Sequence, residues 1–222
     1  MILVGQYDSP FVRRVAVAMH LHGVPFERRV LSVFGDFAEM LKLNPLGKVP
    51  VVQLDDGELL FDSRSILDYL DGLVASDRRL VPAEEPHRHR VLRIEAVALG
   101  LTEKLYERIF EFARRDPAKR DPMVVQRVEQ QIASALSWLE GLRPSPWLYG
   151  DRLTSADLTT AIALTYMQQK APISLPPGSY GSLVAHCARC ESLSAFTSAA
   201  YSADEARRSG WAPESGAHSR PQ

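Results

Sequence analysis

Residues 44–66 hold the groups that are best placed to bind a small ligand. Pro50 follows Val49 at the start of an apolar run, where a residue that cannot donate to a strand ladder is tolerated. If the Val49-Pro50 bond takes the cis form, the backbone N–H and C=O of Val49 face solvent or a peptide-like ligand. Ser63 is the predicted N-cap of a helix that contains Ile66, and a helix N-terminus attracts anions. Together these groups predict a binding surface with an anion site.

A β-hairpin must hold this surface in position. Residues 51–54 and 59–61 are apolar enough for two short strands, and Asp56-Gly57 between them is a typical hairpin turn. Turn-forming residues at positions 44–47 come before the first of these strands. The hairpin therefore connects the Val49-Pro50 turn directly to the start of the next helix.

A helix over residues 12–21 is predicted earlier in the chain, where apolar residues fall on one helical face. Ser9 is its predicted N-cap, Pro10 its first residue and Gly23 its stop signal. Most Ser-Pro pairs before helices are caps and nothing more. Its residue type alone therefore gives Ser9 no further role.

Strands are predicted on either side of that helix. Residues 2–4 and 25–31 have strand character, and a strand–helix–strand order implies a parallel pair joined by a crossover. A short helix over residues 34–43 follows, and then the hairpin and its helix. Residues 1–76 are thus predicted to form a small α/β domain.

The chain changes character after residues 77–86, a charged segment with two prolines that is the predicted linker. Apolar residues recur at spacings of three and four over residues 91–109 and 124–139. Thr154 and Asp157 then resemble a capping box with an acidic third position.

The helix that this box starts, over residues 156–169, is apolar on most faces and is the predicted centre of an all-helical domain spanning residues 87–208. Shorter helices are expected over residues 182–188 and 193–206. Residues 209–222 carry few apolar side chains and are predicted to be a partly disordered tail.

The composition is that of an ordinary globular protein. Of 222 residues, 45% are hydrophobic and 24% charged, and the formal net charge is −1. That balance favours neither nucleic acid nor an anionic membrane as a partner. The apolar runs are shorter than the roughly 18 residues of a membrane span, and no basic region of a signal peptide starts the chain. We therefore expect a cytoplasmic protein.

The cysteines and histidines suggest no redox or metal centre. Cys187 and Cys190 lie in a helical region far from any strand–helix–strand unit, so a structural or an incidental role is expected for both. His87 and His89 have no Cys or carboxylate set near them at metal-ligand spacing. We expect no metal ion.

Three motifs resemble those of the cytosolic glutathione transferase superfamily, and the resemblance covers nearly the whole chain. They are SPFVRR at residues 9–14, NPLGKVP at residues 44–50 followed by Asp62-Ser63, and GDRLTSAD at residues 150–157. The resemblance implies an α/β thioredoxin-like N-terminal domain followed by an all-α helical C-terminal domain. It also implies a homodimer and a glutathione site mostly on the first domain.

The same resemblance implies roles for five residues. Val49, before a cis Pro50, would pair through its backbone with the cysteinyl part of glutathione, and Ser63 would bind the γ-glutamyl carboxylate. Asp62 would face the γ-glutamyl ammonium group, where many relatives carry the longer Glu or Gln. Lys48 is a candidate for the glycyl carboxylate, and its alternative is a solvated turn residue.

Ser9 is the candidate for stabilising the glutathione thiolate, because the Ser-Pro-Phe form is similar to classes whose activating residue immediately precedes Pro. Tyr7 is the alternative, since other classes carry an activating Tyr near the end of the first strand. Thiolate formation near neutral pH requires a pKa shift of roughly two units, about 2.7 kcal/mol. A charge-assisted hydrogen bond contributes roughly 1.5–3 kcal/mol and a helix N-terminus roughly 0.3–1 more. Ser9 could supply both.

The expected activity is conjugation of glutathione to a small electrophile, or a related dehalogenation, isomerisation or peroxide reduction. The alternative is a non-catalytic, glutathione-transferase-like module that binds partner proteins. Tyr106 and Phe110 are candidates for the electrophile pocket, although aromatic residues at that spacing usually belong to a core. Arg13 and Arg14 are expected to brace the contact between the two domains, and the alternative is that they bind a glutathione carboxylate.

Overall fold

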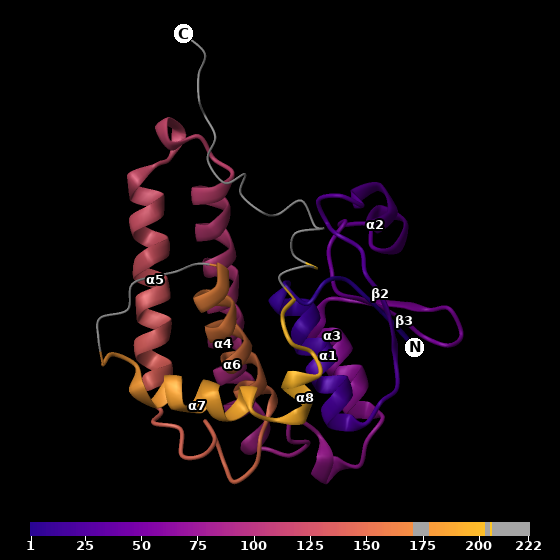
Figure 1. The fold of residues 1–222 in the computed structure, drawn as a ribbon. Coiled ribbons are helices and arrows are strands. Elements are labelled where there is room, and N and C mark those ends of the chain that lie inside the picture. The colour runs from indigo at the N-terminus through magenta and orange to yellow at the C-terminus, as the bar shows by residue number, and fades with distance from the viewer. Residues whose placement is uncertain (171–177, 203–204, 206–222) are drawn as a thin grey trace.

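The computed structural model describes residues 1–170, 178–202 and 205. Figure 1 shows a sheet-containing half beside a half made of long helices. The sheet half contains β1 (Ile2–Val4), α1 (Pro10–His22), β2 (Glu27–Arg29), α2 (Phe37–Leu43), β3 (Val51–Gln53), β4 (Leu59–Phe61) and α3 (Ser63–Gly72). The predicted tail at residues 209–222 lies outside the described residues.

The strands form one sheet in the order β2-β1-β3-β4. β1 pairs with β2 in parallel, and the other two pairings are antiparallel. The hairpin turn closes where the Gly57 N–H donates to the Leu54 carbonyl at 3.0 Å. The predicted thioredoxin-like arrangement is therefore confirmed.

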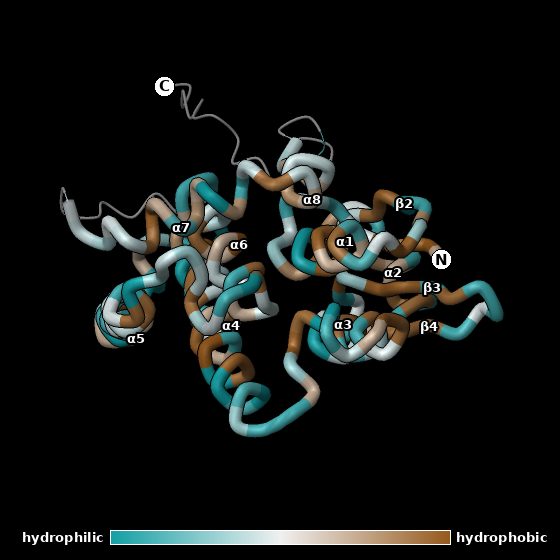
Figure 2. Tube along the Cα trace, turned by 90° about the horizontal axis from the view of Figure 1, so that it is seen from below, coloured by the Kyte–Doolittle hydropathy of each residue, from teal (hydrophilic) through white to brown (hydrophobic). Residues whose placement is uncertain are grey.

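Alternate residues of the strands face opposite sides of the sheet, as the period of two requires. Leu3 and Val52 belong to the large core that includes α1 and α3. Val4 and Val51 face the other side and pack on Met40 of α2. In Figure 2, α1 and α3 lie between the sheet and the long helices, and α1 contacts α6 and α8. The first helix thus lies between the sheet and the helical half.

α1 begins and ends where the sequence predicts. Ser9 is the N-cap, with its Oγ accepting from the Val12 N–H at 3.4 Å, and Pro10 is the first helical residue. Gly23 takes the left-handed conformation at the C-terminus, with φ of 70°. Such a C-cap suits a residue without a Cβ.

The predicted strand over residues 25–31 and helix over residues 34–43 are both shorter in the structure. Ser32 and Asp36 form a local turn: Ser32 Oγ accepts from the N–H groups of Phe34 and Gly35, and Asp36 Oδ2 accepts from the Ser32 N–H at 2.9 Å. Side chains that bind nearby backbone groups compete with regular structure. This turn separates β2 from α2.

The helical half contains α4 (His87–Ala113), α5 (Pro122–Glu140), α6 (Ser155–Lys170), α7 (Gly181–Glu191) and α8 (Ser194–Thr197). Two short 3-10 helices are found at Ser76–Arg78 and Pro117–Lys119. α6 packs against α4, α7 and α1, and most of its residues are buried, so its predicted central position is confirmed. The domain boundaries at residues 76, 86 and 208 stay predictions.

The helix predicted over residues 193–206 is wrong in length, because α8 ends at Thr197. The N–H groups of Ala199 and Ala200 bind carbonyls three residues back, at 3.2 Å in both cases. Bonds of this kind tighten and end a helix. Among the described residues, no helix has a stretch that is both long and apolar enough for a transmembrane segment.

Asp157 holds the start of α6 in place. Its Oδ2 accepts from the Thr154 N–H at 2.8 Å and from Thr154 Oγ1 at 2.7 Å, which is the predicted box. Its Oδ1 accepts from the Leu148 N–H at 2.7 Å, so the same carboxylate also fixes the preceding loop. Asp157 is fully buried.

We expect Asp157→Ala to lower the free energy of unfolding by about 3–5 kcal/mol, because three buried donors lose their acceptor. Urea unfolding followed by circular dichroism measures this change. Asp151→Ala is the matched control, since Asp151 is exposed in the same loop, and it should change stability by less than about 0.5 kcal/mol. Equal stability of the two variants would show that Asp157 does not anchor this loop.

Candidate functional site

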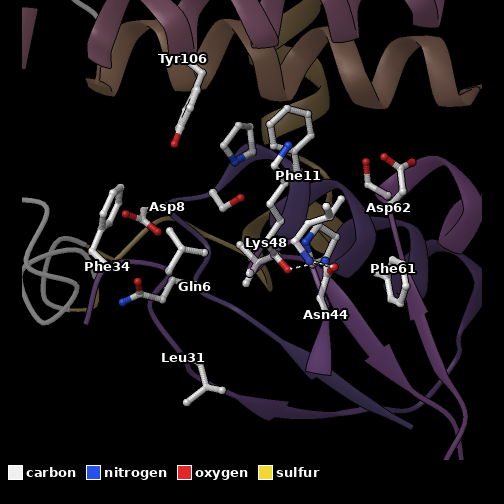
Figure 3. Close-up of a pocket in the computed structure, with 18 of the residues that line it drawn as sticks. Gln6, Asp8, Phe11, Leu31, Phe34, Asn44, Lys48, Phe61, Asp62 and Tyr106 are labelled. Atoms are coloured by element: carbon white, nitrogen blue, oxygen red, sulfur yellow. Dashed lines mark hydrogen bonds between the residues drawn. The ribbon is translucent and has the colours of Figure 1, made fainter. Parts of the chain in front are cut away.

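A cavity of about 630 Å³ lies where the two halves meet. Its floor is made by the start of α1, the turn before β3 and the start of α3, and its opposite wall comes from α4 and α6 (Figure 3). The volume lies within the range usual for small-molecule sites. All of the predicted glutathione-binding residues, Lys48, Val49, Pro50, Asp62 and Ser63, line it, together with Ser9.

The Val49-Pro50 bond is cis, which is the form the sequence reasoning considered. No hydrogen bond to another described residue uses the Val49 N–H or C=O. Gly5 makes room for this turn, because a Cβ there would lie 2.5 Å from Val12 and 3.1 Å from Val49. A backbone N–H and C=O without partners among the described residues, at the lining of the cavity, suit a peptide-like ligand.

Asn44 shapes the loop that carries Lys48. It is buried, its Nδ2 donates to the Lys48 carbonyl at 2.9 Å, and its Oδ1 accepts from the Leu46 N–H at 3.0 Å (Figure 3). The Lys48 side chain forms no ion pair with any residue in the described part of the chain. Its ammonium group is therefore available to an anionic ligand.

The N-cap of α3 is Asp62, and the prediction that Ser63 fills this position is wrong. Asp62 Oδ1 accepts from the Arg64 N–H at 2.8 Å, and Ser63 is the first helical residue. Asp62 has φ of 67° and ψ of 126°, a conformation that is uncommon for residues other than Gly. The shift of one residue leaves the Ser63 N–H pointing out of the helix N-terminus, where backbone donors attract anions.

Arg14 fixes the position of the Ser63 hydroxyl through a hydrogen bond. Ser63 Oγ accepts from Arg14 Nη1 at 3.0 Å, so the hydroxyl proton of Ser63 remains available to an acceptor in the cavity. Arg14 Nη2 donates to Glu95 Oε1 on α4, and Glu95 Oε2 accepts from Ser155 Oγ on α6 at 2.6 Å. All four side chains are buried. They form a continuous chain of hydrogen bonds, here called the Arg14 chain, from the cavity into the helical half.

Burial lowers the pKa of Arg14, and the neighbouring Glu95 carboxylate only partly offsets this effect. Arg13 makes a second contact between the halves through paired bonds to Glu191 at 2.7 and 2.6 Å and one to the Ala199 carbonyl at 2.8 Å. The bracing role predicted for both arginines is confirmed. The contact of Arg14 with Ser63 was not predicted from the sequence.

Ser9 and Tyr7 occupy different environments. Ser9 lines the cavity and uses only an acceptor lone pair for its capping bond, so its proton can be donated to a ligand. Tyr7 is not among the lining residues, and the guanidinium of Arg28 lies 3.5 Å from the centroid of its ring. Burial raises the pKa of Tyr7.

Tyr106 lines the cavity and points into it from α4 (Figure 3). Phe110 does not line this cavity; it lines a smaller neighbouring one of about 260 Å³ and packs on Tyr106 with ring centroids 4.8 Å apart. One further turn along α4 carries Phe110 away from the opening. Tyr106 therefore remains a pocket candidate, and Phe110 supports it from the side.

Sequence reasoning missed two residues of α6 that line the cavity, Tyr166 and Lys170. Lys170 Nζ lies 3.5 Å from Asp8 Oδ2, next to Ser9. Their spacing of four was the available signal, because it places two long side chains with polar tips on one face of the helix. Cys187 and Cys190 are buried in α7 and line neither cavity, and burial raises the pKa of both thiols.

Family models match both halves of the chain: the glutathione S-transferase N-terminal domain over residues 3–78 and the C-terminal domain over residues 101–194. An Escherichia coli K12 relative, the uncharacterized GST-like protein YibF, is 32% identical over 75% of this chain and 82% of its own length. The chain belongs to the cytosolic glutathione transferase superfamily. Maleylacetoacetate isomerase of Pseudomonas aeruginosa is 28% identical over 71% of this chain and 77% of its own.

Solved glutathione transferases share the fold. The enzyme of Methylobacillus flagellatus, with glutathione bound, has a TM-score of 0.83 and 27% identity and covers 90% of this chain and 99% of its own. A family member from Pseudomonas fluorescens Pf-5, also with bound glutathione, has a TM-score of 0.81 and 27% identity, covering 90% and 98%. These likenesses confirm the two-part fold.

Proposed function

We propose that this glutathione transferase family member stabilises the thiolate of glutathione for attack on a small electrophile. The observation that carries the proposal is convergence: Ser9, the Val49-Pro50 turn and the Asp62-Ser63 pair come from three separate segments and line one cavity. A module that only binds partner proteins has no need of all three. The relatives that hold glutathione in their solved structures support the same co-substrate here.

The floor residues fit the groups of the tripeptide. The unused backbone groups of Val49 suit the cysteinyl peptide unit, and Lys48 suits the glycyl carboxylate. The Ser63 N–H and Oγ–H suit the γ-glutamyl carboxylate, with the N-terminus of α3 adding its partial positive charge. Asp62 uses one carboxylate oxygen for its cap, which leaves the other for the γ-glutamyl ammonium group.

Ser9 is the proposed thiolate-stabilising residue. It caps α1 with a lone pair and can donate its proton to sulfur, and the N-terminus of the same helix favours negative charge. Tyr7, the alternative, has less support because it does not line the cavity. Glutathione supplies the nucleophilic sulfur when bound, and the residues of this chain hold and orient it.

We expect Ser9→Ala to raise the apparent pKa in the pH profile of kcat/KM by about one to two units, because a donor worth roughly 1.5–3 kcal/mol to the thiolate is lost. The rate near neutral pH falls correspondingly by about 10- to 100-fold. Conjugation of chlorodinitrobenzene, followed by absorbance across a pH series, measures both quantities.

Ser9→Gly separates chemistry from capping, since Gly caps a helix almost as well as Ser but has no hydroxyl. It should lose activity as Ser9→Ala does, whereas Ser65→Ala, at an exposed position of α3 outside the cavity, should match the wild type. An unchanged pH profile in Ser9→Gly would exclude the hydroxyl. Calorimetric titration of the wild type with glutathione tests the function itself: no binding up to millimolar concentration would favour the non-catalytic module.

The Arg14 chain predicts that Arg14 positions Ser63 toward the γ-glutamyl carboxylate. Arg14→Lys keeps the charge but loses the fork that reaches Ser63 and Glu95 together. We expect it to weaken S-methylglutathione binding about tenfold, the size of one hydrogen bond to a charged group. An analogue without the γ-glutamyl α-carboxylate should bind both proteins equally. Isothermal calorimetry measures the affinity of each of the two ligands for the wild type and for Arg14→Lys.

Arg13→Lys is the matched control, because Arg13 also makes an arginine contact between the halves and does not touch Ser63. It should bind S-methylglutathione as the wild type does. If Arg14→Lys weakened both ligands equally, its effect would be structural and the positioning role would be lost.

The proposal keeps the homodimer and the cytoplasmic location that the family resemblance and the composition imply. It leaves conjugation, isomerisation, dehalogenation and peroxide reduction as the reaction types of the site. A sedimentation equilibrium mass equal to one chain would contradict the dimer, and recovery in a periplasmic or extracellular fraction would contradict the location.

A further inference from the structure

The charged side chains that line the cavity do not match an anionic ligand. Among the described residues, four are carboxylates and two are ammonium groups: Asp8, Lys48, Asp62, Glu103, Glu107 and Lys170. Glutathione itself carries two carboxylates and one ammonium group, and its thiolate adds a further negative charge. Nearby charges of the same sign disfavour the ionised form of a titrating group. A thiolate in this cavity therefore needs a cation that offsets the carboxylates closest to it.

Lys170 is one of the two cations in this lining, and it lies beside the proposed thiolate site. Its Nζ is 3.5 Å from Oδ2 of Asp8, the residue before Ser9, and Asp8 and Ser9 both line the cavity (Figure 3). Lys48, the other cation, comes from the loop before β3, where the proposed function assigns it to the glycyl carboxylate. Lys170 is thus the lining cation that remains for the carboxylate next to Ser9.

The pair of Asp8 and Lys170 is fixed and shielded from water. The two side chains are 15% and 9% exposed. The ring of Tyr201 lies 5.0 Å from the ammonium group, within the range of a cation–π interaction. Lys170 is also the last residue of α6, where the helix dipole favours a cation. Because salt screens partly buried charges less than exposed ones, each member of the pair acts strongly on groups near it.

The Asp8 carboxylate already affects another acidic group of the cavity. Tyr166, one turn before Lys170 on α6, has a pKa that is raised by burial, by Tyr106 and by the negative charge of Asp8. The same charge would oppose the ionisation of a thiol at Ser9. The other titratable side chains around the pair are Tyr201, which packs on Lys170, and those that line the same cavity: Lys48, Asp62, Glu103, Tyr106 and Glu107.

We propose that Lys170 neutralises and positions the Asp8 carboxylate, so that the glutathione thiolate forms beside an ion pair and not beside a free carboxylate. Lys170 acts on the sulfur through Asp8 and is therefore a positioning residue, whereas Ser9 is the group that touches the sulfur. The inference rests on the proposed function and gives it a second determinant of thiolate formation. The thiol proton leaves to water, and no other reactant takes part.

Two single variants with opposite expected effects test the pair. Lys170→Met should raise the pKa of the bound thiol by about one unit, because it leaves Asp8 unpaired beside the sulfur. Asp8→Asn should lower it by about one unit, because it leaves the Lys170 ammonium unpaired there. The ultraviolet absorbance of the thiolate, titrated against pH in protein saturated with glutathione, measures this pKa without an electrophile.

The double variant separates charge from structure. Asp8→Asn with Lys170→Met should return the pKa to within about half a unit of the wild type, because neither charge remains. Lys170→Arg keeps the cation and should do the same. Loss of a merely structural contact would instead shift the pKa in the same direction in both single variants, without recovery in the double variant. That pattern, or an unchanged pKa in Lys170→Met, would overturn the inference.

Lys42→Met is the matched control. Lys42 pairs with Glu39 at 2.6 Å on α2 and does not line the cavity, so the pKa of the bound thiol should equal that of the wild type. A shift as large as that of Lys170→Met would show that loss of any lysine charge has this effect, and would contradict a specific role of the pair.

The wild type alone distinguishes this failure from failure of the proposed function. If it binds glutathione with a lowered thiol pKa and the variants share that pKa, only the role of Lys170 is rejected. If calorimetry detects no binding of glutathione, the glutathione site is rejected and this inference with it. If glutathione binds but its thiol keeps the ordinary pKa of about 8.5, thiolate stabilisation itself is rejected.

Discussion

The buried guanidinium of Arg14 is the interaction on which the rest of the site depends. It connects Ser63, at the start of α3, to Glu95 and through it to Ser155 in the helical half. Removing a charge pair from water is costly unless its groups are hydrogen-bonded; both Nη atoms of Arg14 donate hydrogen bonds, and its buried Nε has no partner among the described residues. Because Arg14 donates hydrogen bonds both to Ser63 and to Glu95, the position of the cavity floor is coupled to the packing of α4 and α6.

That coupling divides the cavity into two kinds of surface. The floor is built from turns and helix starts, whose backbone N–H and C=O groups are exposed by geometry and can recognise a peptide of fixed structure. The wall is built from side chains of α4 and α6, such as Tyr106 and Tyr166, which can change without disturbing the turns. A constant co-substrate and a variable second substrate would suit this division.

Most of the fold was predictable from local patterns. Ser9, Pro10 and Gly23 marked the ends of α1 correctly, and the two short apolar runs around the Asp56-Gly57 turn marked the hairpin, because both signals depend on neighbouring residues only. The errors arose where side chains bind the backbone locally, as at Ser32 and Asp36, or where a helix ends without Gly or Pro, as at Thr197. Such ends of helices and strands depend on local contacts that the spacing of apolar residues does not encode.

For the same reason, the floor of the site was predictable, whereas in its wall only Tyr106 was named from the sequence and Tyr166 and Lys170 were missed. Val49-Pro50 and Asp62-Ser63 are contiguous motifs whose backbone geometry follows from the residues themselves. Tyr106, Tyr166 and Lys170 meet only because α4 and α6 pack together, and 60 residues of sequence separate the two tyrosines. Even in the floor, the sequence predicted the wrong N-cap for α3, because Asp62 and not Ser63 fills that position. An Asp with a positive φ caps α3 one residue early, and the Ser63 N–H then belongs to the first helical residue, where it is open to a ligand.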